Sequence, residues 1–187
     1  MATLRLSKFD VAERQLLQAI TLFFRNEDPV SIHTLTEASV QVLIDIGKEH
    51  GATSFLRESD LIREEHKKEW LHYVNKSRNF FKHADRDPNE IHEFNTIVND
   101  YALLDAVAMY ERIKKKWVPE TLVFNVWLGI EHPNLLLEGS EYQQMFARAI
   151  ADGRLPATAD KGVMAEMIEK IRSGQLSYPN LCLELGL

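Results

Sequence analysis

One short segment of the sequence gathers side chains that can do chemistry together. Arg78, Asn79 and His83 stand close to one another in it. An arginine can hold a phosphate through two parallel hydrogen bonds, and a histidine can move a proton near neutral pH. The asparagine can orient the histidine or a phosphate oxygen. Metal-free RNA cleavage requires such groups, because an acid or base must act at the reacting oxygens while a cation stabilises the developing charge.

Other polar side chains of the same segment are candidates for binding rather than catalysis. They are Lys76, Lys82, Asp85 and Arg86. The aromatic residues Phe80 and Phe81 also belong to the segment, and we interpret them as core residues rather than as platforms for stacked bases. Lysines and arginines concentrate positive charge there, which suits a phosphate or nucleotide ligand.

Each catalytic candidate also has a structural interpretation. Arg78 can pair with an acid of a neighbouring helix, such as Asp100 or Asp105. His83 can serve as a cap at the C-terminal end of a helix, where the helix dipole stabilises a cation. His33, in a different segment, is interpreted as structural.

The sequence predicts neither a metal site nor a cofactor. It has no glycine-rich phosphate loop, no nucleophile-elbow motif, and a single cysteine, Cys182. The seven histidines are scattered along the chain. His66 and His72 are the nearest pair on one predicted helix, and they lie about 120° apart around its axis.

The elements that must position these residues are helices. Apolar residues recur at three- and four-residue steps and predict four long helices. They are expected at about 8–26, from Pro29 or Ser31 toward Gly51, at about 59–83 and at about 89–117. Three shorter helices are predicted at about 121–130, 140–152 and 158–172. We therefore predict an all-α protein, with an up-down four-helix bundle over residues 1–117 and a helical C-terminal extension, residues 118–187, packed on it.

Local signals set the predicted helix ends. Ser7 and Asp10 have capping-box spacing, Pro29 or Ser31 can open the second helix, and Gly51 suits a left-handed C-terminal cap. The predicted buried side of the third helix contains Trp70, Val74, Phe80 and Phe81. That of the fourth contains Ile91, Phe94, Ile97, Val98, Tyr101, Leu104, Ala108 and Ile113. The apolar tail around residues 178–183 is expected to pack against the protein.

The motif Arg78-Asn79-x-x-x-His83, at the end of the third helix of a four-helix bundle, resembles the Arg-x4–6-His motif of HEPN (higher eukaryotes and prokaryotes nucleotide-binding) domains. The resemblance covers roughly residues 8–117. It implies a metal-independent ribonuclease that acts as a homodimer, with the two motifs facing each other. One toxin-like branch has a tyrosine two residues after the histidine, where this chain has Asp85, so that branch's regulation is not transferred.

Helix geometry adds a condition to this hypothesis. On a continuous helix, residues 78 and 83 lie about 140° apart, so Arg78 and His83 cannot both face one phosphate. Either the helix unwinds near Lys82, or two protomers supply complementary groups across a twofold axis.

Composition limits the choice of function. The 187 residues carry a formal net charge of −6, which disfavours broad, nonspecific nucleic-acid binding. No apolar run is long enough to span a membrane, and the first residues lack a secretory pattern, so we expect a cytoplasmic protein. Three hypotheses follow: a homodimeric ribonuclease that binds RNA or a nucleotide, a noncatalytic helical module with a degenerate motif that binds a protein partner, and a purely structural helical protein.

Overall fold

The computed structural model describes residues 3–58, 60, 62–85, 88–177 and 183–184. Within these residues the secondary structure is helical, which confirms the all-α prediction, and the β-structure is one isolated bridge between Trp117 and Leu183. The α-helices are α1 (Lys8–Phe24), α2 (Pro29–Gly47), α3 (Glu64–Lys82), α4 (Val98–Lys114), α5 (Pro119–Glu131), α6 (Glu141–Ala151) and α7 (Lys161–Arg172). None of the described helices has the length and apolar character needed to cross a membrane.

The chain divides into two compact units. The first contains residues 1–19 and 28–114, and the second contains residues 20–27 and 115–187. Helix α1 therefore contributes its first turns to one unit and its last turn to the other. The candidate residues 76–86 all belong to the first unit.

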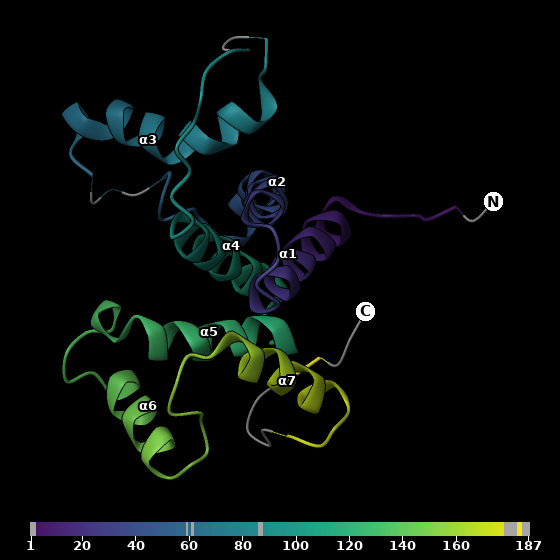
Figure 1. Ribbon diagram of the computed structural model, residues 1–187, viewed down its shortest axis with the longest axis vertical. Helices are drawn as coiled ribbons and strands as arrows, with labels where there is room; N and C mark the ends of the chain where they lie inside the picture. Colours follow the sequence, from purple (N-terminus) through teal and green to yellow (C-terminus); the bar gives the residue numbers. More distant parts are fainter. Residues whose placement is uncertain (1–2, 59, 61, 86–87, 178–182, 185–187) are drawn as a thin grey trace. The chain divides into compact units, whose positions relative to one another are not determined.

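Helix α2 is the central element of the first unit, with α1, α3 and α4 around it (Figure 1). It packs most extensively on α4. The Ser39 hydroxyl donates a hydrogen bond to the Ala12 carbonyl of α1 at 2.9 Å, and Asn99 of α4 donates to the Pro29 carbonyl at 3.0 Å. Several buried side chains of α2 are polar, and each needs a hydrogen-bonding partner. Ser39 has its partner on α1, His33 on α4, and Glu37 pairs with Arg57 from the segment before α3.

The predicted starts of α1 and α2 and the predicted left-handed Gly51 are confirmed. The Asp10 backbone N–H donates to the Ser7 hydroxyl at 3.1 Å and the Ser7 N–H donates to the Asp10 carboxylate at 2.7 Å, which is a reciprocal capping box. Asp28 caps α2 by accepting from the backbone of residues 30 and 31, and Pro29 stands in the first turn. After a 3₁₀ turn at Lys48–His50, Gly51 adopts a left-handed conformation with φ of 64°.

Two predicted helix starts are wrong. Helix α3 begins at Glu64 instead of near 59, a residue that itself lies outside the described part of the chain. Helix α4 begins at Val98 rather than at 89, although the apolar residues before it have helical spacing. The Asn95 side chain accepts a hydrogen bond from the Ile97 backbone at 3.2 Å, so a local turn competes with the helix there. Ile91, predicted to be buried, is 90% exposed.

The predicted buried faces of α3 and α4 also need correction. The most deeply buried apolar residues of α4 are Ala102, Leu103, Ala106, Val107, Met109 and Tyr110, whereas the predicted Tyr101, Leu104, Ala108 and Ile113 are half-buried. The buried side of α4 includes the polar residues Asn99 and Asp105, which have hydrogen-bond partners in the core and which an apolar pattern does not reveal. On α3 the predicted buried side is only half-buried.

The second unit is built on an aromatic cluster. The last turn of α1 supplies Phe23 and Phe24, which contact Phe124 and Trp127 of α5. The Lys161 ammonium lies 3.5 Å from the centre of the Phe23 ring, a cation–π contact that connects the start of α7 to the cluster. Helix α5 packs on α7 in this unit. Of the predicted packed tail, residues 178–182 lie outside the described residues, while the Glu184 N–H donates to the Trp117 carbonyl at 2.8 Å.

Candidate functional site at the end of α3

The histidine of the predicted motif stands immediately beyond a helix end. Helix α3 stops at Lys82, and His83 has φ of −127° and ψ of 67°, outside the helical region. The His83 backbone N–H still donates to the Asn79 carbonyl at 3.1 Å, so His83 is the C-terminal cap residue. Because the backbone angles of His83 are not helical, its side chain need not point in the direction calculated for a continuous helix.

The arginine of the motif is held by a neutral partner. Arg78 is half-buried, and its Nη2 donates to the Gln41 Oε1 of α2 at 2.7 Å. The Gln41 amide in turn donates to the Asp45 carboxylate at 3.2 Å, which orients its carbonyl oxygen toward the arginine. The structural alternative named an acid such as Asp100 or Asp105 as the partner of Arg78, and the partner that the structure shows is the amide oxygen of Gln41. Asp105 instead contacts Arg57 and Ser54.

The remaining candidates differ in their surroundings. Lys82 follows Arg78 by one helical turn, and its pKa is lowered, mainly by partial desolvation and secondly by the positive charge of Arg78. Asn79 and Lys76 are exposed on another side of α3, and Asp85 is exposed beyond its end. Arg86 lies outside the described residues. The cations Arg78 and Lys82 and the exposed amide of Asn79 thus lie near the end of α3. A bound anion would relieve the repulsion between the two cations.

A cluster of rings anchors the end of α3 and includes a histidine that sequence reasoning missed. The Ser77 hydroxyl and the His92 Nε2 are 2.9 Å apart, and the His92 ring lies 5.0 Å from the Phe80 ring. Phe81 contacts Phe94 at 5.2 Å between ring centres. The non-helical segment before α4 is thereby attached to α3. The signal in the sequence was the alternation of His92 and Phe94, which suits an extended segment better than a helix.

A buried charged network connects α2, α3 and α4, and no pattern in the sequence predicted it. Arg57 forms ion pairs with Glu37 of α2 at 2.7 Å and with Asp105 of α4 at 3.4 Å. Its Nε donates to the Asn75 side chain of α3 at 3.1 Å. The Ser54 hydroxyl donates to Asp105 at 2.6 Å. Burial raises the pKa of Asp105, and the Ser54 hydrogen bond and the Arg57 charge oppose that rise.

His33 is a core residue, as its structural interpretation requires. It is 1% exposed, and its Nδ1 lies 3.0 Å from the Asn99 Oδ1. Its ring contacts those of Phe81 and Phe94. Burial lowers the pKa of His33, and the negative charge of Glu37 partly opposes this shift. His33 therefore favours the neutral form and helps to position Phe81, the residue before Lys82.

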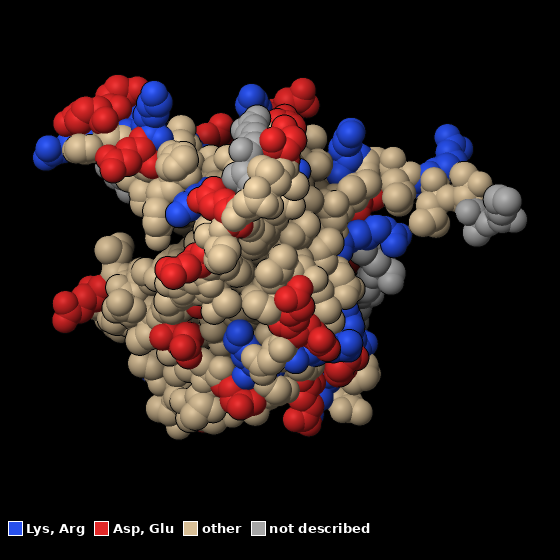
Figure 2. Space-filling model, turned by 45° about the horizontal axis from the view of Figure 1, so that its top comes forward, with Lys and Arg blue, Asp and Glu red and all other residues tan. Residues whose placement is uncertain are grey.

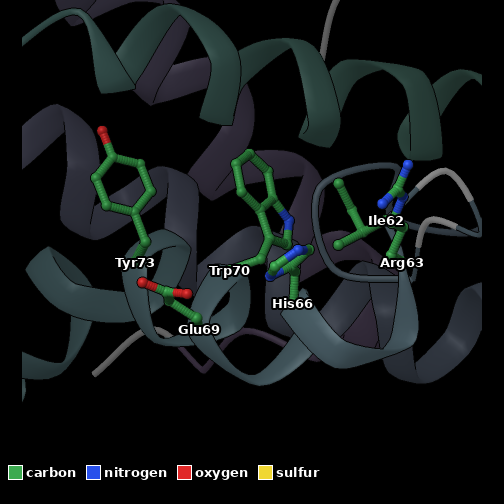
Figure 3. Close-up of a pocket in the computed structure, with 6 residues that line it drawn as sticks. All are labelled: Ile62, Arg63, His66, Glu69, Trp70 and Tyr73. Carbon is green, nitrogen blue, oxygen red and sulfur yellow. The ribbon is translucent and has the colours of Figure 1, made fainter.

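The first half of α3 carries an open pocket of about 600 Å³. Figure 3 shows the rings of Trp70 and Tyr73 extending from the helix in the same direction, with Glu69 and His66 beside them. Ile62 and Arg63, from the segment that leads into α3, complete the lining. No pattern in the sequence predicted this pocket.

Charge is mixed on the face of the molecule that Figure 2 presents, where acidic and basic side chains are interspersed. Among the described residues, no group of three or more histidine, cysteine, aspartate or glutamate side chains is arranged to hold a metal ion. Binding of an anion by the first unit therefore depends on local groups such as Arg78 and Lys82 rather than on a broad basic surface.

Comparison with models of known protein families, with curated proteins and with solved structures finds no match to this chain.

Proposed function

We propose that this protein is a metal-independent ribonuclease of HEPN type that acts as a homodimer, with Arg78, Asn79 and His83 as its catalytic residues. The observation that carries the proposal is the end of α3 at Lys82. His83 is the cap residue and has nonhelical backbone angles, while Arg78 stays on the helix, so helix periodicity alone does not fix the angle between their two side chains. The resemblance of the motif to HEPN domains supports the same assignment.

The residues suit cleavage by the neighbouring 2′-hydroxyl of RNA. His83 accepts the proton of the 2′-hydroxyl as its oxygen attacks the phosphorus, and Arg78 stabilises the charge that develops on the phosphoryl oxygens. The bond to the 5′-oxygen then breaks, and that oxygen takes up a proton. Asn79, exposed one turn before His83, can orient the imidazole or the phosphate.

A homodimer completes this chemistry. The reaction requires one group to accept a proton and another to donate one, and each protomer contributes a single His83 to the motif. A second copy across a twofold axis supplies the second imidazole and a second Arg78–Lys82 pair. The dimer is also what the resemblance implies, so a mass of about twice 21.6 kDa in solution is part of the proposal.

The test is RNA cleavage in EDTA by purified protein and by two histidine variants. His83→Ala is expected to abolish cleavage and to leave the melting temperature nearly unchanged, because the cap uses the backbone of His83. His72→Ala, which removes an exposed histidine from the same helix, is the matched control and is expected to keep full activity. Unaltered cleavage in His83→Ala would remove the proposal.

The alternative is a noncatalytic helical protein-interaction module in which the motif is degenerate. Two observations favour it: the Arg78 guanidinium already has an internal partner in Gln41, and the net charge is −6. This alternative predicts no RNA turnover by the wild-type protein under any metal-free condition. Turnover that is lost in both Arg78→Ala and His83→Ala would contradict it.

A further inference from the structure

We propose that the open pocket on the first half of α3, formed by Ile62, Arg63, His66, Glu69, Trp70 and Tyr73, binds an unpaired nucleobase of a single-stranded RNA substrate. This inference rests on the proposed function, because it names the part of the substrate that this surface holds. Nucleic-acid strands are commonly bound by aromatic side chains on which bases stack, combined with cations near the backbone.

The two aromatic side chains form a preorganised platform. The Trp70 Nε1–H donates to the Leu56 carbonyl at 2.6 Å, which fixes the orientation of the indole. The Tyr73 ring lies 6.2 Å from the indole at an interplanar angle of 30°. Tyr73 is 67% exposed, so its ring face is available to a ligand. A base that stacks here gains contact area while the protein loses little side-chain freedom, since one of the two rings is already fixed.

The polar residues of the pocket match the edge and the backbone of a nucleotide. The Glu69 carboxylate can accept hydrogen bonds from an exocyclic amino group, which adenine, cytosine and guanine have and uracil lacks. Arg63 and His66 can donate to phosphate or sugar oxygens. The neighbouring Glu64 pairs with Lys67 at 2.8 Å, so part of the acidic charge at the start of α3 is already neutralised by a lysine of the same helix.

The pocket and the motif lie along the same helix. Tyr73 and Asn79 are six residues apart, which corresponds to about 9 Å along the axis of α3 and about 120° around it. A short stretch of single-stranded RNA spans such a distance, so a base in the pocket can belong to the strand whose phosphate reaches the helix end. The mixture of two rings, a carboxylate, a guanidinium and an imidazole also suits a flat, hydrogen-bonding ring better than an aliphatic side chain of a protein partner.

The experiment measures binding without turnover. Fluorescence anisotropy follows the binding of labelled ten-nucleotide oligoadenylate and oligouridylate to the full-length His83→Ala protein. Adding Tyr73→Ala is expected to weaken oligoadenylate binding about 5- to 150-fold, the range measured for the loss of one base–aromatic stack. Tyr142→Ala, which removes a 45% exposed tyrosine from α6, is the matched control and is expected to leave affinity unchanged.

A second variant tests base selection. The parent protein is expected to prefer oligoadenylate over oligouridylate, and Glu69→Gln is expected to reduce that preference, since an amide can hydrogen-bond to either base. Circular dichroism melting of each variant checks that the fold is retained.

The outcomes separate this inference from the proposed function. If wild-type protein cleaves RNA in EDTA but Tyr73→Ala binds RNA as tightly as its parent does, the base pocket is wrong and the ribonuclease stands. If Tyr73→Ala weakens binding but the wild type cleaves no RNA, the pocket stands and the ribonuclease is wrong. Failure of the parent protein to bind either oligonucleotide overturns the pocket.

Discussion

Arg57 neutralises two carboxylates in the interior of the first unit, and its replacement leaves both without a counter-charge. The side chains of Arg57, Glu37 and Asp105 are 8%, 2% and 0% exposed. Removing one partner from a buried ion pair typically costs about 3–5 kcal/mol, because the remaining charge is uncompensated. We predict that Arg57→Met lowers the free energy of unfolding by about that amount at pH 7.5. For a chain of this length, that corresponds to a melting temperature about 6–20 °C lower.

The loss is expected to depend on pH in a defined direction. Burial already raises the pKa of Asp105, and without the Arg57 charge this pKa rises further. A carboxyl whose folded-state pKa is raised destabilises the fold at high pH and ceases to do so as pH falls, because the folded state then takes up the proton more readily than the unfolded state. The stability difference between Arg57→Met and wild type is therefore smaller at pH 5 than at pH 7.5.

The assay is urea unfolding followed by circular dichroism at both pH values. Arg154→Met is the matched control, because its partner is the exposed Asp152 and surface ion pairs contribute little to stability. Adding Glu37→Gln to Arg57→Met is expected to restore part of the lost stability by removing one unpaired charge. A loss in Arg57→Met no larger than in Arg154→Met, or one that is the same at both pH values, would refute the reasoning.

Two further predictions concern the first unit and one glycine of the second. Burial lowers the folded-state pKa of His33, so the wild-type protein is expected to lose stability as pH falls below about 6.5. His33→Gln is expected to reduce this loss, measured by urea unfolding at pH 7.5 and pH 5.5. A Cβ at Gly47 would lie 2.6 Å from the Ala52 carbonyl oxygen, so Gly47→Ala is expected to destabilise by about 1–3 kcal/mol. Gly162→Ala, whose Cβ would meet only a carboxylate oxygen at 3.2 Å, is expected to be neutral or stabilising; equal melting temperatures for the two alanine variants would contradict the steric argument.

Much of the helical framework could be predicted from the sequence because its signals are local. The capping box at Ser7, the proline at the start of α2 and the left-handed Gly51 each act within a few residues of the chain. The end of α3 at Lys82 agrees with the end predicted near residue 83. The packing of His92 and Phe94 against α3 is a tertiary feature, and no local signal specifies it.

The candidate site was predictable in part. The spacing of Arg78, Asn79 and His83 identified the segment, and a pattern of a few residues is enough for that. The partner of Arg78 was not predictable, since Gln41 is 37 positions away and has no charge to suggest the pairing. The pocket at Trp70 and Tyr73 was missed because its charged neighbours have the composition of an ordinary solvated helix.

By itself the sequence determined where most helices form, because hydrogen bonds and caps within a helix involve neighbouring residues. It also identified the short segment of candidate catalytic side chains. Tertiary structure decided which face of α4 is buried. Asn99 and Asp105 are buried there because His33, Ser54 and Arg57 supply their partners from distant parts of the chain. A polar residue can enter a core only when such a partner satisfies it, and that partner is known only once the helices have packed.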